Sequence, residues 1–440
     1  MSAPLLPDTI FAPATAPGRA AIAVIRVSGP LAGPALQALA GAAPPPRRAR
    51  RVRLRDPVGG EAIDDALALW FPAPHSATGE DVAEFQVHGS RAVVAALTEA
   101  LRGLGLRLAE PGEFTRRAFL AGKLDLTQAE AIADLVAAET EAQRRQALRQ
   151  LDGALGALYR NWSARLLRVL AHLEAAIDFP DEDLPPAIEA EVAAETARLA
   201  AEIDGHLVDN RRGERLRDGI VITIVGPPNA GKSSILNLLA QREAAITSPI
   251  AGTTRDVIEV AIDLGGYPVV LADTAGLRDS ADAIEQEGLR RALARAEAAD
   301  LRLFVFDAAR PQDAAGAAAW PGRDTLLVAN KIDLAPHAAL PAGALAVSAL
   351  TGAGIAALTA ALAQRVAADY DSAAPALTRT RHREALETAL AALRRAVAAP
   401  FPELRAEDLR LVWRSLGRIT GQVDVEYLLD VIFADFCIGK

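Results

Sequence analysis

Short runs of alternating apolar and polar residues, separated by turn-forming residues, fill the first 118 positions of the chain. This pattern predicts strands at residues 20–25, 62–71 and 82–87, because alternate side chains of a strand point to opposite faces. Residues 91–101 instead repeat apolar side chains every three or four positions, as a helix does. We expect residues 1–118 to form one compact α+β domain.

Helical spacing dominates residues 119–215 and again residues 373–440. Apolar residues recur at intervals of three or four from 148 to 177, which predicts one long helix with a single apolar face. These residues are Leu148, Leu151, Leu155, Leu158, Trp162, Leu166, Val169, Leu173 and Ile177. Because such a face is stable only when it is covered, we expect the two segments to pack together as one helical domain split by an insertion.

Residues 216–372 are the predicted insertion, in which apolar runs alternate with helical stretches. The runs lie at 219–225, 257–262, 269–272, 301–306, 326–329 and 345–347. Strands that alternate with helices form mainly parallel, doubly wound sheets. The predicted fold class is therefore multidomain α/β and α, with an α+β domain, a split helical domain and an inserted α/β domain.

A glycine-rich stretch, GPPNAGKSS, follows the first strand of the insertion and precedes a helical run. Its glycines let the backbone fold closely around an anion, toward which the following helix directs its N-terminus. In this pattern Lys232 reaches the β- and γ-phosphates of a nucleotide, and the Ser233 hydroxyl binds Mg²⁺. The predicted nucleotide contacts of the loop are Asn229, Ala230, Gly231, Lys232, Ser233 and Ser234.

Three later motifs predict that the nucleotide is GTP. Asp273 ends a predicted strand, where it can hold Mg²⁺ through water. Asp333 can accept two hydrogen bonds from guanine that adenine does not offer, and residues 348–350 supply a backbone N–H for the guanine oxygen. The further predicted contacts are Ser248, Thr253, Thr254, Asp273, Thr274, Ala275, Gly276, Asn330, Lys331, Asp333, Ser348, Ala349 and Leu350. With Thr254 as a second Mg²⁺ ligand, the set predicts a Ras-like P-loop GTPase domain.

The residue after Gly276 is Leu277, where many small GTPases carry the glutamine that orients the attacking water. Another group must therefore orient this water. Four acidic residues just downstream are candidates, although for any single one of them the sequence alone favours a solvated helix start. They are Asp279, Asp282, Glu285 and Glu287.

Composition bears on the compartment in which the chain is expected and on the partners that it can bind. No run of about 18 or more uncharged apolar residues occurs, so no transmembrane helix is expected. The single cysteine, Cys437, cannot form an internal disulfide, which favours the cytoplasm. The net charge of −9 argues against a globally basic surface for nucleic acid. A local exception consists of Arg47, Arg48, Arg50, Arg51, Arg53 and Arg55. Since no aromatic residues interleave with them, a solvated loop and strand face is favoured over an RNA contact.

Taken together, these motifs resemble the MnmE (TrmE) family of bacterial tRNA modification GTPases over nearly the whole chain. The most specific marks are Pro17-Gly-Arg19, Pro111-Gly-Glu-Phe-Thr115, Lys123-Leu-Asp-Leu126, Ala175-Ala-Ile-Asp-Phe-Pro180, Gly252-Thr-Thr-Arg-Asp256 and Phe436-Cys-Ile-Gly-Lys440. GTPases such as Era and Der share the Gly-Thr-Thr-Arg-Asp stretch, so the C-terminal motif is the more diagnostic one.

The resemblance implies a cytoplasmic homodimer joined through its N-terminal domains, which bind 5,10-methylene- or 5-formyl-tetrahydrofolate. It also implies an FAD-containing partner, MnmG. The pair adds an aminomethyl or carboxymethylaminomethyl group to C5 of the tRNA wobble uridine. The folate contacts implied by the family are Arg26, Glu84, Lys123 and Lys440. Cys437, three residues before Lys440, is either a small buried hydrophobe or a nucleophile near the modification site.

The resemblance also implies that GTP hydrolysis depends on K⁺ and on dimerisation of the nucleotide domains, and not on an arginine finger. The implied K⁺ ligands are Asn229, Ser248, Ile250 and Thr253, and Glu285 is the implied catalytic residue, acting through water. Two alternatives stay open. One is an Era- or Der-like RNA-binding GTPase, which would need a KH-type module or a second nucleotide domain. The other is a folate-dependent one-carbon transferase in which GTP is regulatory.

Overall fold

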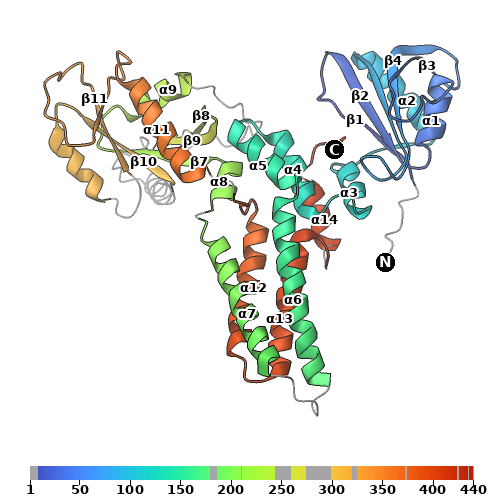
Figure 1. The fold of residues 1–440 in the computed structure, drawn as a ribbon. Coiled ribbons are helices and arrows are strands. Elements are labelled where there is room, and N and C mark those ends of the chain that lie inside the picture. The colour runs from blue at the N-terminus through green and yellow to red at the C-terminus, as the bar shows by residue number, and fades with distance from the viewer. Residues whose placement is uncertain are drawn as a thin grey trace, which may run out of the picture. The chain divides into compact units, whose positions relative to one another are not determined.

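The computed structural model describes residues 8–178, 186–209, 211–242, 259–273, 299–319, 325–371, 374–423, 426–434 and 436–439 (Figure 1). The chain divides into two compact units. The first comprises Met1–Ala133, Gln150–Ala197 and Ala391–Lys440, and the second comprises Asp134–Arg149 and Arg198–Leu390. The boundaries of the predicted domains, at residues 118, 215 and 372, stay a prediction.

The first unit begins with a six-stranded sheet in the order β3-β4-β5-β2-β1-β6. Its strands are β1 (Ile10–Pro13), β2 (Ala20–Ser28), β3 (Arg50–Arg55), β4 (Ala62–Phe71), β5 (Val82–Gly89) and β6 (Arg107–Leu108). Neighbours are antiparallel except β1 and β6. Helices α1 (Ala32–Ala40) and α2 (Arg91–Gly103) bury their apolar residues against the sheet, which confirms the predicted α+β domain.

Helices from before and after the insertion pack together within the first unit. Helix α6 lies along α13, and Leu429 and Phe433 of α14 form one apolar cluster with Leu126 and Ala129 of α4. The predicted split helical domain is thus confirmed. The helices outside the two sheets are α3 (Glu113–Leu120), α4 (Leu126–Ala137), α5 (Glu141–Leu151), α6 (Ala154–Asp178), α7 (Pro186–Leu207), α8 (Arg212–Asp218), α12 (Thr380–Ala398), α13 (Pro402–Thr420) and α14 (Glu426–Ala434).

The prediction of one helix through residues 148–177 is wrong. Helix α5 ends at Leu151 and α6 begins at Ala154. Gly153 lies between them in the left-handed conformation, with φ +87°. A glycine in this conformation terminates a helix at no steric cost, whereas the apolar spacing simply continues across the break. The predicted apolar face of α6 is nevertheless buried, as Trp162 and Leu166 show.

The second unit holds a six-stranded sheet in the order β12-β11-β10-β7-β9-β8. All neighbours are parallel except the edge strand β8, which is antiparallel to β9. The strands are β7 (Ile220–Val225), β8 (Glu259–Leu264), β9 (Tyr267–Asp273), β10 (Leu301–Asp307), β11 (Thr325–Asn330) and β12 (Leu345–Ala346). The described helices of this domain are α9 (Lys232–Arg242), the 3₁₀ helix η1 (Pro311–Ala319) and α11 (Ile355–Tyr370). The predicted mainly parallel sheet is confirmed.

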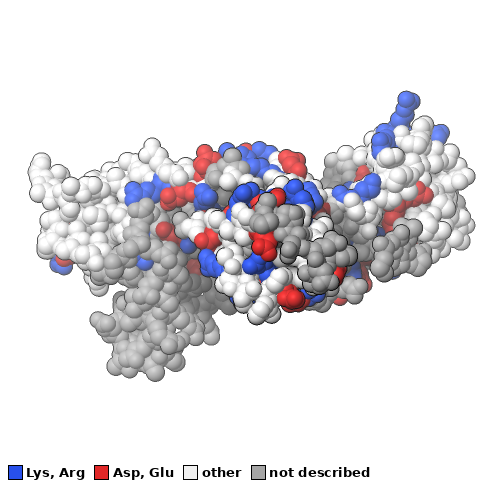
Figure 2. Space-filling model, turned by 60° about the horizontal axis from the view of Figure 1, so that its bottom comes forward, with Lys and Arg blue, Asp and Glu red and all other residues white. Residues whose placement is uncertain are grey.

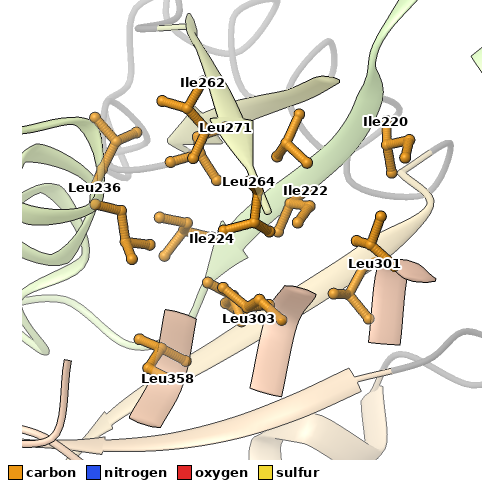
Figure 3. Close-up of a cluster of buried hydrophobic side chains, with 14 of the residues drawn as sticks. Ile220, Ile222, Ile224, Leu236, Ile262, Leu264, Leu271, Leu301, Leu303 and Leu358 are labelled. Atoms are coloured by element: carbon orange, nitrogen blue, oxygen red, sulfur yellow. The ribbon is translucent and has the colours of Figure 1, made fainter. Parts of the chain in front are cut away.

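Aliphatic side chains from β7, β8, β9 and β10 fill the space between this sheet and helices α9 and α11 (Figure 3). Ile222, Leu271 and Leu303 are completely buried, and Leu236 and Leu358 cover them from the helices. Burial of each such side chain stabilises the fold by about 1.5–3 kcal/mol. This core fixes β7, β9, β10 and β11 side by side, so that the loops after their carboxyl ends share one edge of the sheet.

None of the described helices combines the length and the apolar content that a membrane crossing requires.

Candidate nucleotide site

A tight loop joins β7 to α9 and carries the glycine-rich stretch. Gly226 has φ +140° and Gly231 has φ +92°, conformations that residues with a Cβ rarely adopt. A Cβ at Gly226 would lie 2.0 Å from the carbonyl oxygen of Val305, and one at Gly231 would lie 2.2 Å from Nδ2 of Asn330. Both positions therefore require glycine, and close packing against β10 and β11 sets the shape of the loop.

Lys232, the first residue of α9, folds back over this loop. Its Nζ donates to the carbonyl oxygens of Gly226, at 2.9 Å, and Pro227, at 3.0 Å. Burial lowers the pKa of the ammonium group, while the charge of Asp273 acts in the opposite direction. A desolvated cation attracts an anion more strongly than a hydrated one does. The loop thus holds a buried positive charge whose present partners are backbone carbonyls that an incoming phosphate can replace.

Ser233 and Asp273 meet beside Lys232. The Ser233 hydroxyl donates to Oδ2 of Asp273 over 2.6 Å. They come from α9 and from the end of β9, and they meet because β7, which leads into α9, pairs directly with β9. Hydroxyl and carboxylate oxygens are of the type that Mg²⁺ prefers. The structure therefore brings these two predicted residues together in a form that fits the ion.

The side-chain amide of Asn330 connects two loops. Its Nδ2 donates to the carbonyl oxygen of Ala230 over 2.8 Å, and its Oδ1 accepts the N–H of Ala349 over 2.9 Å. Asn330 is 1% exposed, so both hydrogen bonds are shielded from water. The phosphate-binding loop and the loop at residues 348–350 are consequently held in fixed register by one side chain.

The carboxylate of Asp333 is held by Ser348, in the loop that Asn330 also contacts. The Ser348 hydroxyl donates to Oδ1 of Asp333 and accepts the N–H of Thr351. One carboxylate oxygen is thereby fixed by the neighbouring loop. Leu350 is 85% exposed, and Ser234 is exposed on α9.

Lys331 has a partner that the sequence analysis missed. Its backbone is left-handed, with φ +64°, and its Nζ donates to Oδ2 of Asp307 over 2.9 Å. Burial alone would raise the pKa of Asp307, but the hydrogen bond from Lys331 and the N–H of Ala309 hold that pKa below its usual value. The signal in the sequence is an acidic residue that ends the apolar run 301–306, as Asp273 ends another.

Many of the predicted site residues lie outside the described ranges. Asn229 is described and is exposed in the loop, with a left-handed φ of +59°. The predicted residues outside the described ranges are Ser248, Ile250, Thr253, Thr254, Thr274, Ala275, Gly276, Leu277, Asp279, Asp282, Glu285, Glu287 and Lys440.

Two of the four predicted folate contacts meet in the N-terminal sheet. Arg26 of β2 and Glu84 of β5 are directly opposed in register, and Nε of the arginine lies 2.9 Å from Oε1 of the glutamate. The Arg26 guanidinium also lies over the ring of Phe114, 5.8 Å from its centroid. Lys123 is placed differently, because its Nζ donates to the carbonyl of Pro74.

The C-terminal residues reach the N-terminal sheet. Ile438 forms a β-bridge with Pro111, and a Cβ at Gly439 would lie 2.2 Å from the carbonyl oxygen of Pro13. Cys437 is exposed, so the expectation of a small buried hydrophobe is wrong for this residue. The last described residues thus lie against the N-terminal domain, within the first unit.

Arg117 forms a buried ion network that motif reasoning did not predict. Its side chain is 2% exposed and pairs with Asp8, Glu80 and Glu113 at 2.8–3.1 Å. Arg107 joins the network through Glu113. The sequence does not predict this network, because the three carboxylates come from separate parts of the chain. The network fixes α3 to the N-terminal segment and to the loop before β5.

The fold and the assembled motifs define a class of protein. A phosphate-binding loop after β7, an aspartate at the end of β9, and the loops after β11 and β12 meet at one edge of a mainly parallel sheet. This chain is a P-loop GTPase whose nucleotide domain is inserted into a helical domain.

Comparison with known proteins gives the family. A family model described as the MnmE helical domain matches residues 126–437, and one described as the GTP-binding protein TrmE N-terminus matches residues 9–123. A protein of Rhodospirillum rubrum named tRNA modification GTPase MnmE is 60% identical over 98% of this chain and 99% of its own length. Relatives of the same name from Parvibaculum lavamentivorans and Paramagnetospirillum magneticum are also 60% identical, each over 98% of this chain and 100% of the relative. The chain belongs to the MnmE family of tRNA modification GTPases.

Proposed function

We propose that this chain hydrolyses GTP at the edge of the second sheet and that hydrolysis serves the modification of tRNA, the activity for which its relatives are named. The observation that carries the proposal is the double hydrogen bond of Asn330, which joins the phosphate-binding loop to the loop at residues 348–350. A site that binds the phosphates and the base of one nucleotide needs its two binding loops held at a fixed distance from each other.

Guanine selection rests on Asp333. A carboxylate accepts hydrogen bonds from guanine N1–H and the 2-amino group, and adenine has no matching pair of donors. Ser348 holds one oxygen of Asp333, which orients the carboxylate before nucleotide binds. The N–H of Ala349 is held by Asn330, so the guanine oxygen would share this donor.

Phosphate binding rests on the loop Asn229 to Ser234, with Lys232 as the cation that meets the β- and γ-phosphates. Ser233 and Thr254 would hold Mg²⁺, and Asp273 would hold it through water. Bound Mg²⁺ supplies positive charge where negative charge develops during phosphoryl transfer. The Ser233–Asp273 pair fits this role because its two oxygens already lie 2.6 Å apart.

We propose K⁺ as a second cation, held by Asn229, Ser248, Ile250 and Thr253, and Glu285 as the residue that positions the attacking water through an intervening water. The exposed side chain of Asn229 and its left-handed backbone are compatible with this role. The remaining nucleotide contacts proposed here are Thr274, Ala275, Gly276, Lys331 and Leu350.

The N-terminal domain is proposed to bind a tetrahydrofolate one-carbon donor through Arg26, Glu84, Lys123 and Lys440, in a homodimer. The side chains of Arg26 and Glu84 are 27% and 18% exposed, so their polar groups are within reach of a ligand. A guanidinium can pair with the glutamate tail of a folate, and a carboxylate can accept from its pterin edge. The redox step is assigned to the flavoprotein partner MnmG, and the acceptor is C5 of the wobble uridine, in the cytoplasm.

The test of the nucleotide reaction is GTP turnover in KCl and in NaCl at equal ionic strength, across a range of protein concentrations. Faster turnover in KCl, rising with protein concentration, is expected for a K⁺-assisted dimer. Glu285→Ala should slow turnover and leave GTP affinity nearly unchanged. Equal rates in both salts would favour the Era- or Der-like alternative.

The test of the modification reaction uses tRNA, a methylene-folate and GTP, with and without the flavoprotein, and the nucleoside product is measured by mass. Product should appear only with the flavoprotein. Product in its absence would assign the one-carbon chemistry to this chain alone and support the folate-dependent transferase.

A further inference from the structure

The arginine-rich stretch of the N-terminal domain lies at an open edge of its sheet. Strand β3 is the first in the order β3-β4-β5-β2-β1-β6 and, among the described strands, pairs only with β4. Six arginines occupy this strand and the turn before it, and all are exposed. They are Arg47, Arg48, Arg50, Arg51, Arg53 and Arg55. Figure 2 shows basic side chains projecting from this domain, at the right of the view.

Among the described residues, one carboxylate, that of Asp65, pairs with two of these six arginines. Asp65 accepts two hydrogen bonds from Arg53, at 2.9 and 3.2 Å, and lies 3.8 Å from Arg51. In the parts of the chain that the structure describes, Arg47, Arg48, Arg50 and Arg55 form no ion pair. Three of these four arginines lie together at residues 47–50, and Arg51 beside them has its carboxylate only at 3.8 Å.

The register of the sheet explains why Arg50 faces no carboxylate. Arg50 faces Ala68 and Arg51 faces Leu67 on β4, whereas Arg53 faces Asp65. From residue 66 to residue 71 strand β4 carries no charged side chain. Arg50 and Arg51 thus border an apolar stretch of β4, and the carboxylates of this strand lie farther along the hairpin, where Asp65 reaches Arg51 only at 3.8 Å.

The backbone at this edge is fixed. The N–H of Arg47 donates to the carbonyl of Trp70 over 2.8 Å, and its guanidinium donates to the carbonyl of His75 over 2.8 Å. Arg47 keeps its full charge, because a carbonyl does not neutralise it. Arg47 is therefore held in position, which reduces the entropy lost when it binds an anion.

We propose that Arg47, Arg48, Arg50 and Arg51 contact the phosphodiester backbone of tRNA. The inference rests on the proposed function and names the surface that meets its substrate. Guanidinium groups bind phosphate oxygens through paired hydrogen bonds. The chain as a whole carries a net charge of −9, so attraction of RNA requires a place where positive charge is concentrated. Charges on an edge strand also prevent edge-to-edge pairing, but that role does not require four cations.

The experiment measures the affinity of the full chain for fluorescently labelled tRNA across a series of KCl concentrations. The test variant is Arg48→Gln with Arg50→Gln, two residues outside the proposed nucleotide and folate sites. The matched control is Arg91→Gln with Arg102→Gln, two exposed arginines of α2 whose loss changes the net charge equally. GTP turnover is measured in all three proteins as a check on folding and on the nucleotide site.

The test variant should bind tRNA at least about tenfold more weakly at about 0.1 M salt, and the slope of log affinity against log salt should fall by about 1.5. The control should bind like the parent chain, and turnover should be equal in all three. Equal loss in control and test variants would show a general charge effect and overturn the proposal. Unchanged tRNA binding by the test variant would also overturn the proposal. Absence of GTP turnover in the parent chain would count against the proposed GTPase reaction. The comparison of tRNA binding would still show whether the arginine edge contacts tRNA.

Discussion

The side-chain amide of Asn330 donates to the backbone carbonyl of Ala230, 2.8 Å away and 100 positions earlier in the chain. The same side chain accepts the N–H of Ala349. Since Ala230 and Asn330 are each 1% exposed, water cannot substitute for either partner. One buried amide thus connects the loop proposed to bind phosphates with the loop proposed to bind the base.

Replacing Asn330 by Ala should destabilise the nucleotide domain by about 2–3 kcal/mol, because two buried hydrogen bonds are lost and the carbonyl of Ala230 is left without its donor. Hydrogen exchange of the β7 and β11 amides measures this locally. Affinity for GTP and for GDP should fall together, since the loop and not a γ-phosphate contact is disturbed. Leu350→Ala, at an exposed position in the neighbouring loop, should change the free energy of opening obtained from the exchange rates by less than about 0.5 kcal/mol. Equal protection in parent and Asn330→Ala would contradict the linking role.

Gly213 and Gly205 form a matched pair for testing how tightly the chain is packed where it enters the nucleotide domain. A Cβ at Gly213 of α8 would lie 2.2 Å from the carbonyl oxygen of Leu377, whereas one at Gly205 of α7 would meet nothing within 4 Å. Gly213→Ala should cost about 1–3 kcal/mol through overpacking. Gly205→Ala should stabilise the helix by about 0.5–1 kcal/mol. Thermal unfolding of both variants measures the difference, and a lower melting temperature for Gly205→Ala than for Gly213→Ala would reject this packing.

His206 should make stability depend on pH. Burial lowers the pKa of its imidazole below the usual 6.5, the charges of Arg383 and His382 act in the same direction, and Asp209 opposes them. The unfolded chain therefore binds a proton at this residue before the folded chain does. Stability is fully present above about pH 6.5 and falls as the pH decreases from there toward the folded-state pKa.

Urea unfolding at several pH values between 5 and 7.5 measures this effect. His206→Gln should flatten the dependence, whereas His172→Gln, at an exposed position of α6, should leave it unchanged. A pH dependence of His206→Gln equal to that of the parent would assign the proton uptake to another group.

The sequence predicted the strands of the nucleotide domain to within about two residues, because each apolar run is as long as the buried part of its strand. The glycine-rich loop was equally visible, since Gly226 and Gly231 occupy positions that exclude any Cβ. These features are local, and local pattern is what a sequence shows directly.

Features that depend on pairing between distant segments could not be read in the same way. The network of Arg117 with Glu80 and the pair of Lys331 with Asp307 exist only after separate elements come together. The break at Gly153 was missed for a different reason. The apolar period continues through it, and the Asp-Gly stop was the only local sign.

The most direct test of the central claim, that the edge of the second sheet binds a guanine nucleotide, is the nucleotide preference of Asp333→Asn. An amide at this position offers a donor where guanine also presents a donor, whereas xanthine presents an oxygen there. Affinities for GTP and XTP are measured by competition against a fluorescent nucleotide. We expect GTP affinity to fall at least about tenfold, because the guanine N–H groups lose their acceptor, and XTP affinity to rise. Unchanged preference for GTP would remove Asp333 from the base site and contradict this account of the site.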